Sequence, residues 1–72
     1  MIEQYAKVRI LTNRFHADGV RAGDTGYAIE CYPKGRYEVE ISKSDGVTIA
    51  QFVAEEAELQ QNDHRTPKKD RK

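Results

Sequence analysis

The stretch that decides the fold covers residues 22–41 and reads AGDTGYAIECYPKGRYEVEI. Its start, Gly-Asp-Thr-Gly at 23–26, predicts a turn, because glycine adopts positive φ without steric cost and the Asp side chain can accept from backbone amides. Residues 27–32 are rich in aromatic and other strand-favouring side chains, Pro-Lys-Gly at 33–35 interrupts them, and residues 36–41 alternate polar and apolar. The stretch therefore predicts a β-hairpin.

The alternation in the second strand of this hairpin separates a buried side from a wet one, as the two-residue period of a strand requires. The buried side receives Tyr37, Val39 and Ile41, and the charged side receives Arg36, Glu38 and Glu40.

The residues before the hairpin predict one more strand and a long loop. Residues 5–11 place Ala6, Val8 and Ile10 on one face, which is typical of a half-buried strand. The loop at 12–25 is long for so short a chain, and its only large apolar groups are Phe15 and Val20. Such a loop is either packed down by these anchors or used for binding.

After the hairpin, Ser-Asp-Gly at 44–46 predicts another turn, and residues 47–53 predict a fourth strand. We expect Val47, Ile49 and either Phe52 or Val53 to point inward there, with a bulge or bend near Ala50 where the buried face changes. Residues 54–59 predict one turn of helix that leads into a short closing strand, with Leu59 as its core anchor.

Four or five short strands without a long helix predict an all-β fold, a small closed or nearly closed antiparallel barrel over residues 1–59. With 72 residues and 38% hydrophobic composition, the chain can build one domain with a thin core. A partner protein or self-association is a natural supplement to the stability of such a domain.

The run VRIL…GVRAGDTGYAIECYPKGRYEVEI…GVTIAQFV…EL resembles a family of small bacterial SH3-like barrels of unknown function. The resemblance covers residues 5–59 and rests on the Gly-Asp-x-Gly turn, the Tyr-Pro-x-Gly turn, Tyr-Glu-Val-Glu and the acidic segment that ends in Leu. Ala28 and Cys31 stand where larger aliphatic residues are expected. The resemblance implies an SH3-like barrel, and because relatives can be encoded beside toxin-like nuclease domains, it also implies an antitoxin or immunity role.

The charges offer an independent argument. The net charge is zero, but residues 1–59 hold seven basic and ten acidic residues, a balance of −3, whereas residues 60–72 hold five basic and two acidic ones, a balance of +3. The segment 60–72 has no aliphatic or aromatic residue, so we expect a basic, disordered tail. Such a tail is either simply solvated or in contact with RNA, an anionic surface or an acidic partner.

An acidic face repels phosphate backbones and attracts the basic groove of a protein such as a nuclease. We therefore expect a non-catalytic protein-binding module that caps a basic, toxin-like surface, with a cognate protein as its partner. Alternatively, each of these carboxylates belongs to the solvated surface of a small domain and binds no partner. The predicted partner-binding residues are Glu30, Tyr32, Arg36, Glu38, Glu40, Glu55, Glu56 and Glu58.

A nucleic-acid-binding accessory protein is the alternative function. Basic loops and aromatic platforms of small SH3-like barrels bind RNA. Tyr32 or Phe15 would be the platform here, whereas Tyr27 and Tyr37 are expected to pack in the core. The negative balance of residues 1–59 opposes this function. The basic residues in question are Arg14, Arg21, Lys34 and Arg36.

No enzymatic site is expected, because His16 and Asp18 lie close together without a recognisable nucleophile. Cys31 is the only cysteine, which excludes an internal disulfide and a cysteine-based zinc site, and its inward strand position predicts a small core residue. We expect no cofactor and no metal. An unpaired cysteine fits a reducing compartment, and no apolar run approaches the ~20 residues that a membrane span needs. We therefore expect a cytoplasmic protein without a membrane span. The partner, the stoichiometry and the principal contact, whether loop 12–25, acidic face or tail, stay open.

Overall fold

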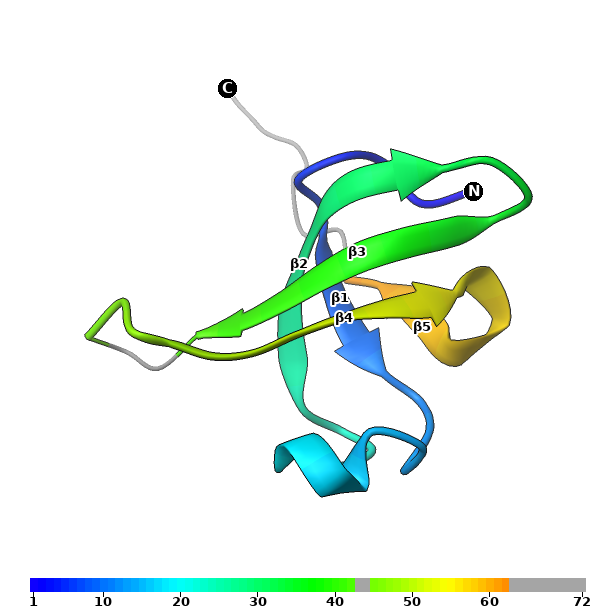
Figure 1. Ribbon diagram of the computed structural model, residues 1–72. Coiled ribbons are helices and arrows are strands. Elements are labelled where there is room, and N and C mark those ends of the chain that lie inside the picture. The colour runs from blue at the N-terminus through cyan, green and yellow to red at the C-terminus, as the bar shows by residue number, and fades with distance from the viewer. Residues whose placement is uncertain (43–44, 63–72) are drawn as a thin grey trace.

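The computed structural model describes residues 1–42 and 45–62, and it is an all-β protein, as predicted. Two single turns of 3-10 helix, η1 (His16–Asp18) and η2 (Glu56–Glu58), interrupt the strands (Figure 1). The predicted tail, 60–72, lies outside the described residues from position 63 onwards, and Gln60 and Gln61 belong to the last strand. The five strands are β1 (Lys7–Ile10), β2 (Thr25–Tyr32), β3 (Arg36–Ser42), β4 (Thr48–Glu55) and β5 (Leu59–Gln61).

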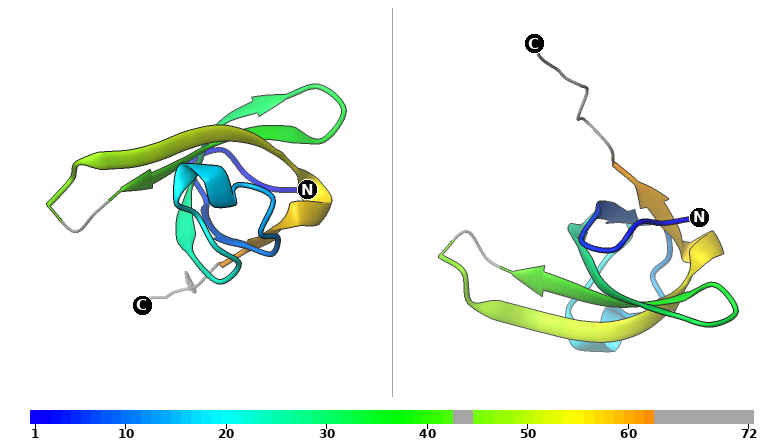
Figure 2. Two further views of the ribbon diagram at one scale, coloured as in Figure 1. Left: turned by 60° about the horizontal axis from the view of Figure 1, so that its bottom comes forward. Right: turned by 90° about the horizontal axis from the view of Figure 1, so that it is seen from above.

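All five strands belong to one antiparallel sheet in the order β4-β3-β2-β1-β5. The sheet curls so that β1 and β5 lie under β3 and β4 (Figure 2). The order does not close into a ring, since β4 and β5 form its two edges. The described residues therefore form a curved open sheet, where the sequence predicted a closed or nearly closed barrel.

Strand β2 holds the two halves of the sheet together. Its first residues pair with β1, with Val8 opposite Gly26, and its later residues pair with β3 through Tyr32 opposite Arg36. Gly26 is buried at the point where these pairings overlap, and an added Cβ would lie only 2.5 Å from the carbonyl oxygen of Glu40. Glycine is required here because the backbones of β2 and β3 approach so closely.

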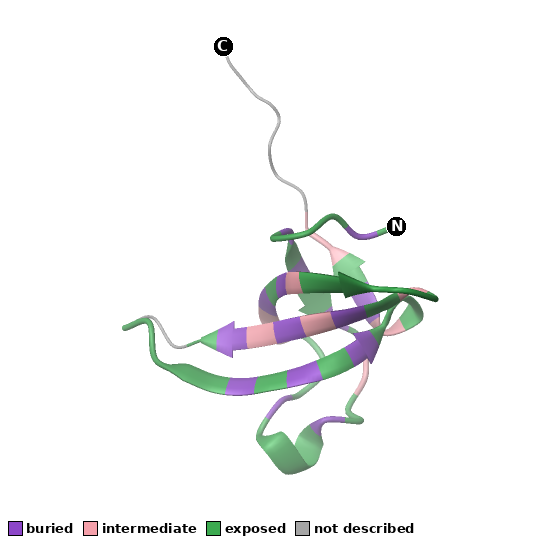
Figure 3. Ribbon diagram, turned by 45° about the horizontal axis from the view of Figure 1, so that its top comes forward, coloured by how far each residue is buried: buried purple, intermediate pink, exposed green. Residues whose placement is uncertain are grey.

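The core fills the concave side of the sheet and follows the predicted alternation in β1 and β3 (Figure 3). Of the two alternatives for the long loop, the structure shows packing by its anchors, because Phe15 and Val20 are buried and the Phe15 ring stacks on Phe52 at 4.0 Å between centroids. The predicted helical turn and closing strand are confirmed by η2 and β5, and Leu59 is buried as their anchor.

The prediction of which residues at the start of β4 point inward is wrong. Val47 and Ile49 are exposed instead of inward, and among the candidates for the next inward residue Phe52 is buried and Val53 is not. The bulge expected near Ala50 does occur: Ile41 pairs with Ala50 and Ser42 with Thr48, so Ile49 is left as the extra residue. From there on, the inward residues of β4 are Ala50, Phe52 and Ala54.

Two further expectations about the core are wrong. Tyr27 is exposed, because it pairs with Glu40 on the convex side of the sheet, whereas Tyr37 is buried as expected. Cys31 does share the side of Tyr37, its partner in the register, and its thiol donates to the carbonyl oxygen of Ile2 at 3.8 Å, but the residue is exposed. The described residues contain no helix with the length and hydrophobicity needed to cross a bilayer.

Candidate protein-binding face

The convex side of β2, β3 and β4 collects most of the predicted partner-binding residues, and we call it the outer face. It results from strand alternation and register, which place Glu30, Glu38 and Val53 side by side across the three strands. The outer face consists of Tyr27, Glu30, Tyr32, Arg36, Glu38, Glu40, Gln51, Val53 and Glu55.

Glu38 lies at the centre of the outer face and is held from both sides. The hydroxyl of Tyr32 on β2 donates to Oε1 of Glu38 at 2.8 Å, and Nε2 of Gln51 on β4 donates to Oε2 at 3.0 Å. The hydrogen bond to Glu38 raises the pKa of Tyr32, because losing the proton would break that bond beside a carboxylate. The carboxylate is therefore fixed in place while Tyr32 stays a neutral donor.

Negative charge dominates this surface. Glu30 lies directly opposite Glu38, and Glu40 follows two residues along β3, where the hydroxyl of Thr48 donates to it. Arg36 is the one basic residue of the outer face, paired in register with Glu55, so four carboxylates against one guanidinium leave a charge of −3. Like charges placed directly opposite each other on neighbouring strands are destabilising. The outer face thus concentrates charge at a cost to the fold.

Glu58 was predicted to belong to this face, but the structure places it in an internal ion pair. Nε and Nη2 of Arg14 donate to its two carboxylate oxygens at 2.6 and 2.8 Å, and the amide of Glu55 donates to Oε1 at 3.0 Å. The bond from Arg14 is the main reason why the pKa of Glu58 lies below its ordinary value. This carboxylate joins the long loop to η2, and its charge is compensated within the chain.

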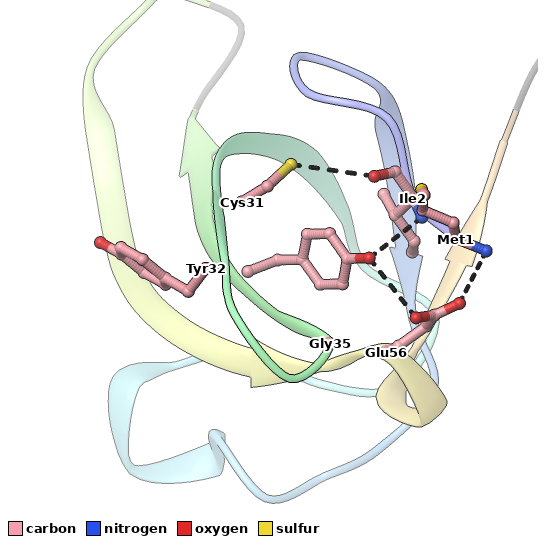
Figure 4. Close-up of a pocket in the computed structure, with 7 residues that line it drawn as sticks. Met1, Ile2, Cys31, Tyr32, Gly35 and Glu56 are labelled. Atoms are coloured by element: carbon pink, nitrogen blue, oxygen red, sulfur yellow. Dashed lines mark hydrogen bonds and ion pairs between the residues drawn. The ribbon is translucent and has the colours of Figure 1, made fainter.

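Glu56 lies at the edge of a separate cavity of about 390 Å³ (Figure 4). The amino group of Met1 is 2.7 Å from Oε2 of Glu56, and this contact is the main cause that lowers the pKa of the Glu56 carboxyl. The hydroxyl of Tyr37 donates to Oε1 of Glu56 at 3.4 Å and accepts from the amide of Ile2 at 3.1 Å. The cavity is lined by Met1, Ile2, Cys31, Tyr32, Gly35, Tyr37 and Glu56.

The structure brings together three residues of the nucleic-acid alternative, since Tyr32 and Arg36 pair in register on either side of the turn that holds Lys34. Phe15 is buried and cannot be a stacking platform, and the guanidinium of Arg14 lies 4.4 Å from the centroid of its ring. The same guanidinium is already bound to Glu58. His16 and Asp18 are exposed on η1, and no group of three potential metal-ligating side chains occurs within residues 1–42 and 45–62.

The structure adds residues to the outer face that sequence reasoning missed. Tyr27, which was expected in the core, is 49% exposed, so its ring is accessible beside the carboxylates, as is the ring of the predicted Tyr32, which is 39% exposed. Gln51 and Thr48 bind Glu38 and Glu40. These two residues are the uncharged polar positions of β4 in the sequence. They could be assigned to the outer face only by knowing which residues of β4 point inward.

The chain was also compared with known proteins. No curated protein matches it, and no solved structure matches it. The model of one protein family, described as a domain of unknown function (DUF4926), matches residues 5–61 and so spans every strand of the sheet. The chain therefore belongs to the DUF4926 family.

Proposed function

We propose that this protein is a non-catalytic protein-binding module that caps a basic surface of a partner protein with its outer face. The observation that carries the proposal is the placement of Glu30 directly opposite Glu38, with Glu40 beside them, on an exposed surface. A fold that only had to be stable and soluble would gain by separating these charges. Such local conflicts are expected where a function requires them.

The geometry of Glu38 suits recognition of a cationic side chain. Because Tyr32 and Gln51 already hold its carboxylate, less side-chain freedom is lost when a partner's Arg or Lys binds. The surrounding negative charge raises the rate at which a basic protein finds the surface. The rings of Tyr27 and Tyr32 add the aromatic contacts that often dominate binding energies at interfaces.

The kind of partner follows from the same charges. A protein surface that holds nucleic acid is basic, so an acidic convex face is complementary to the substrate-binding groove of a nuclease-like toxin. We therefore propose an inhibitory role, as in an antitoxin or immunity protein. The proposed location is the cytoplasm, where a single exposed thiol such as that of Cys31 stays reduced.

The test is affinity capture from the native cytoplasm with the intact chain, followed by purification of the retained protein and measurement of Kd and the association rate. Charge reversal by Glu38→Lys should weaken binding about tenfold or more, which corresponds to about 1.4 kcal/mol, and should slow association. Asp18→Lys is the matched control, because it changes the net charge equally on the exposed η1, away from the outer face.

Equal affinities of the two variants would contradict the proposal. Retention of RNA or DNA instead of a protein, with a steep dependence on salt, would replace it with the nucleic-acid alternative.

A further inference from the structure

Strand β4 has a free edge. It pairs with β3 on one side, and on its other side no strand of residues 1–42 and 45–62 lies next to it. The amide of Glu56, just after β4, donates across to Gly35, so by strand alternation the amides of Ala54 and Phe52 also face β3. Those of Val53 and Gln51 therefore point outward along the edge.

Between Val47 and Ala54 this edge has neither of the two common devices against edge-to-edge pairing, a charged side chain or a proline, and its one irregularity is the bulge at Ile49. Natural edge strands are short or carry lysine, proline or inward-pointing charges. Residues 47–54, VTIAQFVA, contain no charged residue and no proline. By contrast, the opposite edge, β5, is only three residues long. The long uncharged part of β4 that precedes Glu55 is a template for another strand.

Exposed apolar side chains line the same strand. Ile49 and Val53 are 45% and 43% exposed, and the exposed Val47 lies just before β4. Figures 1 and 2 show that the Ser42 and Thr48 ends of β3 and β4 form an arm that reaches out from the rest of the molecule. The start of β4 is thus accessible to a second strand along its outer side.

We propose that β4 pairs antiparallel with β4 of a second copy of this chain, forming a two-fold dimer whose sheet continues through both subunits. A register centred on Gln51 places Val53 of one copy opposite Ile49 of the other, and the symmetry repeats this apolar contact. The same register makes Gln51 its own partner and keeps the outward amides of the two edges facing each other.

The neutrality of the edge itself suits a second copy as its occupant. Because Val47 to Ala54 carry no charge, the same edge of a second copy can pair with them without placing like charges together or burying an unpaired charge. In the proposed register Glu55 lies opposite Val47, and the two Glu55 residues are about 26 Å apart at 3.3 Å per residue. This separation exceeds the Debye length of about 8 Å at physiological ionic strength, so their repulsion is screened.

The dimer does not use the outer face, because pairing at an edge extends the sheet in its own plane. Glu38 and its neighbours remain accessible, and the two outer faces become adjacent. The inference is therefore independent of the proposed function, and each can fail without the other.

The experiment is sedimentation equilibrium of the intact chain from about 1 μM to 1 mM, with and without lysines at the edge. We expect a mass that doubles with concentration, and Ile49→Lys/Val53→Lys should raise the dimer dissociation constant at least tenfold. Leu11→Lys is the control for a lysine at an exposed apolar position, because Leu11 is 49% exposed, lies outside β4 and should leave association unchanged. Circular dichroism confirms that each variant is folded.

A cysteine cross-link tests the register. In the Cys31→Ser background, Gln51→Cys should form a disulfide-linked dimer under mild oxidation, because directly paired Cα atoms lie about 5.5 Å apart, within disulfide range. Val53→Cys should not, since the two copies of residue 53 are about 13 Å apart at 3.3 Å per residue. A wild-type monomer at every concentration, a dimer unaffected by the lysines, or cross-linking at 53 in place of 51 would overturn the proposal.

Discussion

Substitution of Gly26 by alanine should destabilise the sheet at the point where β2 joins its two halves. The new Cβ would lie 2.5 Å from the carbonyl oxygen of Glu40 and 2.6 Å from Cδ1 of Ile41, whereas real Cβ contacts essentially never fall below 3.0 Å. The strands must therefore separate by at least half an ångström. Overpacking of this kind costs about 2–3 kcal/mol.

That cost is a large share of the stability of so small a domain, which is about 4–11 kcal/mol for 72 residues at the usual value per residue. At roughly 4–8 °C per kcal/mol, Gly26→Ala should lower Tm by about 10–20 °C. Thermal unfolding followed by circular dichroism and urea unfolding at 25 °C measure the effect.

A second variant separates the two clashes. Ile41→Val removes Cδ1, so it relieves one contact, but the carbonyl oxygen of Glu40 belongs to the backbone and stays in place. The double variant Gly26→Ala/Ile41→Val should therefore recover little of the lost stability. Full recovery would show that Ile41 alone causes the strain, and an unchanged Tm for Gly26→Ala would refute the close approach of β2 and β3.

Two further predictions concern pH and the single thiol. Because the pKa of Glu58 is lower in the folded chain than its ordinary value of 4.5, its contribution to stability is present above pH 4.5 and is lost as pH falls through the folded-state pKa. Glu58→Gln should thus unfold at lower urea concentration than wild type at pH 7, with the difference shrinking below pH 4.5; a constant difference down to pH 2 would contradict this. Cys31 is exposed, so a thiol reagent should modify it in the native state within a few-fold of the rate for the urea-unfolded chain, and Cys31→Ser should change Tm by less than about 3 °C. Protection of the native thiol by a factor of a hundred would show that the N-terminal residues beside Cys31 shield it from the reagent.

The elements were predictable where a single physical signal decided them. The turn residues 23–26 and 33–35 and the strict alternation of β3 define the central hairpin, and Phe15, Val20 and Leu59 were the only large apolar groups available to anchor their segments. In such segments only one arrangement buries the apolar side chains, so the strand and its inward residues can be predicted from the sequence.

The prediction of which β4 residues point inward failed because both faces of this strand are apolar. Val47, Ile49 and Val53 are larger and more strand-favouring than Ala50 and Ala54, so hydrophobicity alone selects the wrong side. The bulge at the start of β4 sets the phase, and it depends on pairing with β3, which is a tertiary property. Apolar residues on the solvent side are also what an edge strand with a partner would require.

The candidate site was predicted in its acidic residues but not in its organisation. Which carboxylates face each other follows from the register between strands, and a slip of one residue would move Glu38 to the other face. Glu58 looked equivalent to Glu55 in the sequence, yet only the folded loop brings Arg14 to it across 44 positions. No local pattern contains that information.

The pairing of β1 with β5 has a consequence for the order in which the chain folds. Val8 pairs with Gln61, so this contact closes a loop of more than fifty residues, whereas the β2–β3 and β3–β4 pairings close turns of a few residues. Loop closure costs more entropy as the loop lengthens, and distant contacts slow folding. During synthesis β2, β3 and β4 can meet first, and the sheet is completed only after Leu59–Gln61 has left the ribosome.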